Sequence, residues 1–142
     1  MASDFKYITI EQEIKAPMQR VFDAFITEGD LMQWYHASEG WSTPYASVDP
    51  FPGGRFKIGF NDPTGLKTFD FEGSFNRVEA PNYISYTIAD GRSVNITFKD
   101  RGGSTLIVEE FALETENSEE KQRAGWSAQL QNLADFLQRE GF

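Results

Sequence analysis

Cysteine is absent from this sequence, so disulfide bonds and thiolate metal sites are excluded. Long apolar runs are also absent, and the N-terminal ten residues include Asp4 and Lys6. Neither a signal peptide nor a membrane-spanning helix is therefore expected. Together these absences make the cytoplasm the expected location.

Basic residues are scarce and scattered. The chain has 13 Lys and Arg against 22 Asp and Glu, which gives a formal net charge of -9, and it contains no run of Lys and Arg. Nucleic acids bind cationic surfaces through release of counterions, so no nucleic-acid partner is expected. The excess negative charge favours solubility instead.

Histidine occurs once, as His36 in the segment WYHASEGW, and Glu39 is the only acid close to it in sequence. One histidine with one nearby acid is weak support for a metal site or a catalytic base. A partly exposed loop histidine is the favoured interpretation. No catalytic residue, metal ligand or cofactor is assigned.

Aromatic residues, in contrast, are abundant: 13 Phe, 5 Tyr and 3 Trp make up 15% of the chain. Such side chains bring a large apolar area with few torsions to fix. They can fill a core or line a cavity, and composition does not distinguish the two. The length of 142 residues fits a single domain over residues 1–142.

The N-terminal part predicts one strand followed by two helices. Alternating isoleucines indicate a strand over Tyr7 to Ile14. Pro17 suits the first position of a helix, and the apolar spacing predicts that helix over residues 18–26. Asp30 is predicted to cap a second short helix over residues 31–35.

The middle of the chain changes to a period of two, which is typical of strands. After a segment that begins near Tyr45, apolar alternation marks five further strands, over residues 55–60, 69–75, 83–88, 93–98 and 105–113. Turn sequences such as NDPTG and DRGG separate them. Short connections between successive strands favour an antiparallel meander.

The C-terminal segment predicts a long helix. Asn117 and Glu120 resemble a capping box, and an apolar stripe follows at residues 126, 130, 133 and 137. The predicted fold class is therefore α+β: a curved antiparallel sheet of six or seven strands wrapped around the C-terminal helix.

The segment DPFPGGRFKI, Asp49 to Ile58, could form either a phosphate-binding glycine loop or a sharp corner. A phosphate loop needs glycines that lead into a helix. Here Gly53 and Gly54 lead into a strand, so the corner is favoured.

Five segments in order carry a resemblance to a known family: IKAPMQRVFDAF, DPFPGGRFKI, FEGSFNRVEAPNYISYT, GGSTLIVEEF and RAGWSAQLQNLADFL. The chain resembles bacterial members of the family named for the C-terminal domain of the activator of the heat-shock protein 90 ATPase. That family belongs to the START-like, helix-grip (SRPBCC) superfamily. The resemblance matches Gly53, Gly54 and Trp126 to family positions, and it implies a sheet gripping the last helix, often with a cavity between them.

The resemblance leaves three functions open, because the superfamily includes carriers, cyclases and co-chaperones. The first is a carrier or sensor of a small hydrophobic or amphipathic molecule. The second is an enzyme of the cyclase or hydrolase kind, and the third is a stress-response protein associated with a chaperone. The family's co-chaperones join this domain to a separate N-terminal domain, so a chaperone contact is not expected for this domain alone. A homodimer is possible.

The predicted ligand-binding residues are apolar and lie on faces expected to point at the helix. An open pocket of this kind encloses ~300–1,000 Å³, and the rival outcome is close packing of the same rings. The predicted lining is Trp34, Trp41, Phe56, Phe60, Phe71, Tyr86, Phe98, Trp126, Leu130 and Leu133.

A polar handle is predicted from the segment TLIVEEFAL. Glu109 and Glu110 are neighbours in a strand, so one of them faces each side of the sheet. A carboxylate on the helix side is costly unless it is paired or wetted. Arg77, which is expected on the same face of its strand as Phe75 and Phe71, is the predicted partner. The alternative is a wet cavity mouth without chemistry.

Overall fold

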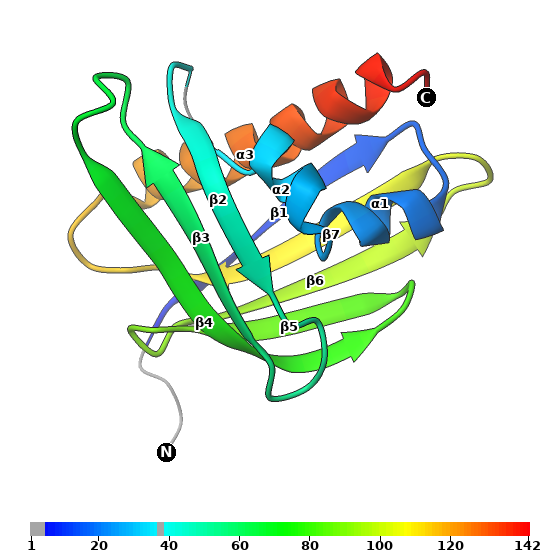
Figure 1. The fold of residues 1–142 in the computed structure, drawn as a ribbon. Coiled ribbons are helices and arrows are strands. Elements are labelled where there is room, and N and C mark those ends of the chain that lie inside the picture. Colours follow the sequence, from blue (N-terminus) through cyan, green and yellow to red (C-terminus); the bar gives the residue numbers. More distant parts are fainter. Residues whose placement is uncertain (1–4, 37–38) are drawn as a thin grey trace.

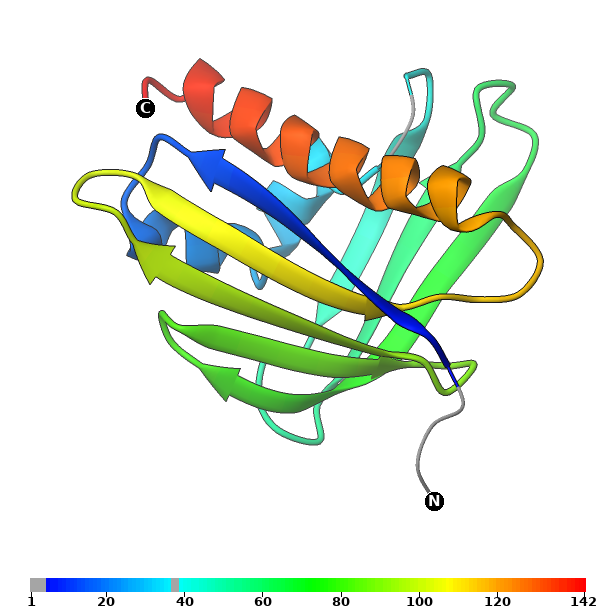
Figure 2. The ribbon, with the colours of Figure 1, turned by 180° about the vertical axis from the view of Figure 1, so that it is seen from behind.

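The computed structural model describes residues 5–36 and 39–142 as a curved antiparallel sheet of seven strands with three helices, as Figures 1 and 2 show. This confirms the predicted α+β class. In chain order the elements are β1 (Tyr7–Ile14), α1 (Met18–Ala24), α2 (Glu28–Trp34), β2 (Ser42–Val48), β3 (Arg55–Asn61), β4 (Thr68–Glu79), β5 (Tyr83–Ile88), β6 (Ser93–Asp100), β7 (Thr105–Ala112) and α3 (Glu119–Arg139).

The strand order is β1-β7-β6-β5-β4-β3-β2, so β2 to β7 form the predicted meander and β1 joins beside the last strand. The helix α3 crosses the sheet near β1, while α1 and α2 cover the side near β2 and β6 (Figures 1 and 2). None of the helices within the described residues is long and apolar enough to cross a membrane.

Two helix starts differ from the sequence-based prediction by a few residues. Thr27 occupies the N-cap position of α2, and Asp30 lies inside the helix, where it accepts a hydrogen bond from Arg20 Nη1 at 2.7 Å. Ser118 caps α3 by accepting from the Lys121 backbone N–H at 3.1 Å. Asn117 lies one residue before this cap, and its backbone and side-chain amides both donate to Glu114.

The double glycine forms a corner between β2 and β3 that is bonded to β4. The Gly53 N–H donates to the Phe75 carbonyl, and the Phe75 N–H donates to the Gly54 carbonyl, both at 2.8 Å. Gly53 has φ +86, in the left-handed region that favours glycine. At Gly54 the constraint is contact, because a Cβ would lie 2.0 Å from the Asp49 carbonyl oxygen.

Candidate functional site

Aromatic rings gather on the inner face of β3, β4 and β5. Phe56 lies at the centre: its ring centroid is 5.0 Å from Tyr86, 5.4 Å from Phe75 and 5.6 Å from Phe71. The Phe56–Tyr86 pair is edge-to-face, a favourable arrangement for rings. Gly73 makes room for this cluster, because a Cβ there would lie 2.7 Å from Phe56 Cζ.

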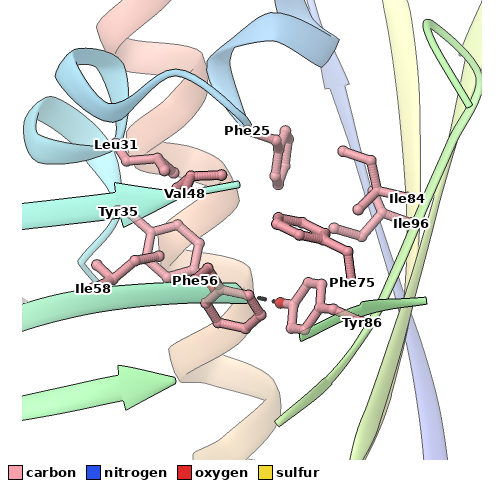
Figure 3. A pocket seen from close by; sticks show the side chains of 10 residues that line it. All are labelled: Phe25, Leu31, Tyr35, Val48, Phe56, Ile58, Phe75, Ile84, Tyr86 and Ile96. Carbon is pink, nitrogen blue, oxygen red and sulfur yellow. Dashed lines mark hydrogen bonds between the residues drawn. The ribbon is translucent and has the colours of Figure 1, made fainter. Parts of the chain in front are cut away.

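The cavity inside this cluster is small. Its volume is about 30 Å³, close to the space of one water molecule. Figure 3 shows the surrounding side chains, which come from α2, the segments that flank it and five strands. They are Phe25, Leu31, Tyr35, Val48, Phe56, Ile58, Phe75, Ile84, Tyr86 and Ile96. In this conformation the rings fill most of the space that the sequence predicted as an open pocket, because they meet edge to face.

Two tyrosine hydroxyls meet at this cavity. Tyr35, at the C-terminal end of α2, and Tyr86, on β5, place their hydroxyl oxygens 3.4 Å apart (Figure 3). Two hydroxyls have two hydrogens, and one such contact uses only one of them. One hydroxyl hydrogen therefore has no acceptor among the hydrogen bonds of the described residues. Burial raises the pKa of both tyrosines, so both stay protonated at neutral pH.

Glu109 is the acid that faces the interior. It is 3% exposed and lies between Ile10 of β1 and Ile96 of β6 in the sheet. Ile96 also lines the cavity. Within residues 5–36 and 39–142, the carboxyl group of Glu109 has no hydrogen bond and no ion pair. Burial raises its pKa to about 8.

Glu109 is coupled electrostatically to the tyrosine pair. Its negative charge contributes to the raised pKa of both Tyr35 and Tyr86. Among the described side chains, His36 Nδ1 is the one polar atom that is both fully enclosed and without a hydrogen bond. The Glu109 oxygens also make no hydrogen bond, so they are not fully enclosed and still reach water-accessible space. The interior thus contains a carboxyl group and a spare hydroxyl hydrogen, both available to a guest molecule.

The other two predicted polar residues lie outside the interior. Glu110 points to the opposite face of the sheet and accepts from Asn95 Nδ2 at 3.0 Å. Arg77 is exposed: its Nη2 lies 2.6 Å from Glu79, and its guanidinium lies 4.8 Å from the Tyr83 ring centroid. The predicted pairing of Arg77 with an inward glutamate is therefore wrong.

A β-bulge explains the position of Arg77. The pairing of β4 with β5 shifts between Phe75 and Arg77, which oppose Tyr86 and Ser85. An extra residue in one strand interrupts the alternation of side chains. Phe75 faces the core, whereas Arg77 faces solvent and the next residue, Val78, packs against the core.

The structure separates the predicted aromatic lining into groups. Phe60 joins the cluster by stacking on Tyr35, with centroids 6.0 Å apart. Trp126 of α3 bridges two regions, because its centroid lies 6.2 Å from Phe71 and 4.7 Å from Phe111. Tyr35 itself was not among the predicted residues. Its spacing of four from Leu31 on a short helix was the available signal.

The remaining predicted residues do not line the cavity. Trp34 is fully buried and donates from Nε1 to the Ala24 carbonyl at 3.1 Å. Phe98 lies beneath α1 in contact with Phe22, at 5.3 Å between centroids. Trp41 pairs with the half-exposed Phe69 at 5.8 Å. Two further predicted residues, Leu130 and Leu133, form the buried aliphatic face of α3.

His36 follows α2, and its carbonyl accepts a hydrogen bond from Asn132 Nδ2 of α3. Burial lowers the pKa of its imidazole. The described residues contain no group of three His, Asp or Glu side chains that could hold a metal ion. Two residues of the segment WYHASEGW, 37 and 38, lie outside the described residues.

Comparison with known proteins gives a consistent result. The family described as Activator of Hsp90 ATPase homolog 1-like protein matches residues 15–138. The solution structure of an AHSA1-like protein from Aeromonas hydrophila is 34% identical, with a TM-score of 0.90 over 96% of this chain and 94% of that one. No curated protein matches the chain.

Two further structures are similar. A solution structure from Cytophaga hutchinsonii is 34% identical, with a TM-score of 0.79 over 94% of this chain and 92% of that chain. A crystal structure from Nitrosomonas europaea is 21% identical, with a TM-score of 0.83 over 94% and 95% of the two chains. The latter likeness concerns the fold alone.

Proposed function

We propose that this chain, which belongs to the Activator of Hsp90 ATPase homolog 1-like family, binds a small hydrophobic or amphipathic molecule between the sheet and α3. It would act as a carrier or sensor of that molecule. One observation carries the proposal: the buried carboxyl group of Glu109 has no hydrogen-bond partner, and it is electrostatically coupled to two tyrosines whose hydroxyls meet in an aromatic interior.

The cost of burying Glu109 is the reason to assign it a function. An acid without a hydrogen bond in an apolar interior loses its hydration and destabilises the fold. An apolar side chain of similar volume would avoid this cost. Strongly perturbed acids cluster at functional sites, where a few polar groups orient a guest within an apolar lining.

Access requires the rings to move, because the cavity holds only about 30 Å³. The partly exposed Trp126 and Phe71 are the side chains expected to move. Trp126 contacts Phe71 on one side and, on the other, lines a surface depression of about 270 Å³ with Lys121, Gly125 and Gln129. Rotation of the indole would join this depression to the aromatic cluster.

The test is a titration with Nile red, a neutral dye whose emission reports apolar surroundings. We expect saturable binding to the native protein. Val48→Trp, which adds volume to the cavity lining, should weaken binding at least tenfold. Phe69→Leu, which alters a half-exposed ring away from the cavity, should leave binding unchanged. Circular dichroism establishes that each variant is folded. Absence of saturable binding to the folded native protein would refute the proposal.

A second candidate function is general acid catalysis on the same scaffold. A carboxyl group with a pKa of about 8 is protonated at neutral pH and can give its proton to a bound substrate. Native mass spectrometry of protein purified without added ligand distinguishes the two functions. A bound compound that is released chemically unchanged after incubation supports a carrier, whereas a compound converted with time supports an enzyme.

Chaperone association is the third candidate, suggested by the printed family description. We expect this domain alone not to stimulate a purified Hsp90 ATPase. A saturable increase of the ATPase rate on titration with this protein would contradict that expectation.

A further inference from the structure

Glu109 is the one carboxylic acid among the buried side chains of the described residues, and no Lys or Arg is buried with it. Ile10 of β1 and Ile96 of β6 flank Glu109, and the residues that α3 buries beyond its first turn are apolar: Leu130, Leu133, Phe136 and Leu137. Tyr35 and Tyr86 are the titratable groups coupled to the carboxyl. The charged group nearest this cluster is Arg92 in the β5–β6 turn, which influences Tyr86.

Arg92 is occupied elsewhere. Its Nε donates to Asp90 at 2.7 Å and its Nη1 donates to the Ala112 carbonyl at 3.4 Å. The ring faces of the cluster favour a cation, because an aromatic face attracts cations. A guest carboxylate or phosphate would find no buried Lys or Arg among the described residues to pair with, and it would hold Glu109 in its neutral form. A guest cation, in contrast, can pair with the Glu109 carboxylate.

We propose that the polar end of the ligand is a protonated amine attached to an apolar body. Its ammonium group donates to the Glu109 carboxylate and to the paired hydroxyls of Tyr35 and Tyr86, and the surrounding rings enclose it. This inference rests on the proposed function and names the ligand class for the same site. The present cavity, at about 30 Å³, is lined by both tyrosines and by Ile96, which pairs with Glu109 across β6 and β7, and it is too small for a whole ligand.

Binding of such a ligand releases a proton. The free protein holds Glu109 as the neutral acid below pH 8, because burial raises its pKa to about 8. The ammonium ion favours the carboxylate, so the acid loses its proton to solvent while the amine keeps all of its own. Amine affinity therefore rises about tenfold per pH unit up to pH 8, and then levels off until the amine itself deprotonates near pH ~10.

The experiment compares octylamine, octanol and octanoate, which share one chain and differ in the polar end. Isothermal titration calorimetry at pH 6, 7 and 8 gives affinities, and two buffers of different ionisation enthalpy give the proton count. We expect octylamine to bind at least tenfold more tightly than octanol at pH 8, and octanoate most weakly. About one proton should be released per octylamine bound at pH 6.

Variants locate the effect. Glu109→Gln keeps the shape of the neutral acid and should reduce octylamine affinity at least tenfold at pH 8 and remove its pH dependence. Tyr35→Phe, which removes one hydroxyl, should reduce octylamine affinity about threefold. Glu110→Gln is the matched control on the outer face and should change nothing.

The outcomes distinguish a failure of the amine assignment from a failure of the proposed binding function. Equal binding of all three compounds, or unchanged octylamine affinity in Glu109→Gln, would overturn the amine assignment while leaving an apolar binding site. If Nile red binds but octylamine does not, the amine assignment alone fails. If neither binds the folded native protein, both proposals fail.

Discussion

The interior has two halves built from different side chains. Beneath α3, strands β1, β6 and β7 present mainly aliphatic residues, including Ile14, Val94 and Ile107, which are at most 2% exposed. Across β3, β4 and β5 the interior is mainly aromatic, and two of its rings, Phe60 and Phe71, are only partly buried. The cavity and the tyrosine pair belong to the aromatic half.

This difference indicates that the two halves of the interior have different roles. The aliphatic half fixes α3 against the sheet by close packing, whereas the aromatic half contains the polar groups and the residual space. Glu109 lies at the boundary: β7 places it among isoleucines, yet its electrostatic coupling is to the tyrosines of the other half. Stability and binding should therefore respond differently to substitutions in the two halves.

The largest effect is expected in the aliphatic half. Leu133→Ala removes a fully buried side chain of α3 and leaves a cavity, so it should lower the free energy of unfolding by about 4 kcal/mol. Urea denaturation measures this. A loss below about 1 kcal/mol would show that this half is not closely packed.

The next substitution, Glu109→Gln, is expected to raise the free energy of unfolding, by an amount that depends on pH. The pKa of Glu109 is raised in the folded protein to about 8, so the folded state retains a proton that the unfolded chain releases above its pKa of 4.5. The stability linked to this group is fully present below pH 4.5 and decreases up to pH 8. Glu109→Gln should remove the decrease, a gain of about 3 kcal/mol at pH 7 relative to pH 4.

Urea denaturation of both proteins at pH 4 and pH 7 isolates this contribution, because all other titrating groups are shared. Glu110→Gln is the control and should follow the native pH profile. A parallel profile for Glu109→Gln would mean that the carboxyl group is hydrated in solution.

A smaller loss of stability is expected at Gly73, where rings of the aromatic half lie against the backbone. In Gly73→Ala the new Cβ would lie 2.3 Å from the Thr87 carbonyl oxygen and 2.7 Å from Phe56 Cζ, so the ring must shift. The expected cost is about 2 kcal/mol by thermal or urea unfolding. Gly29→Ala in α2, whose Cβ would meet nothing within 4 Å, is the control and should be neutral or slightly stabilising.

The smallest effect should come from the rim of the aromatic half. Phe71→Leu changes a partly exposed ring and should cost about 1 kcal/mol or less, while Nile red affinity is retained or increased because the space is larger. Phe111→Leu makes the same change at a fully buried position of β7 and should cost more. Equal costs at the two positions would remove the distinction between the halves.

The sequence predicted the order of the elements well, because apolar periodicity and turn residues are local signals. The side of the sheet that Glu109 faces could not be predicted, since Glu109 and Glu110 are adjacent and chemically identical. Only pairing with Ile10 and Ile96 decides it. The position of Arg77 was mispredicted because its bulge carries no glycine or proline to mark it.

The membership of the candidate site was harder to predict than the fold. Periodicity indicates that Trp34 and Phe98 are buried, and both are, but it does not say which rings they contact. They pack under α1 with Phe25, and Tyr35 takes the place beside Tyr86. Cavity size depends on how side chains from five strands pack together, which no local pattern records.

The pairing of β1 with β7 has a consequence for synthesis. Tyr7 lies opposite Ala112 and Ile14 opposite Thr105. Strand β1 therefore cannot pair until β7, the last strand in chain order, has been made. Strands β2 to β7 can pair one after another as they emerge, each with its predecessor. The first strand and α3 then close the molecule together, and such distant pairings slow folding. Glu109 therefore stays hydrated until β1 pairs with β7, and its desolvation is left to the final step of assembly.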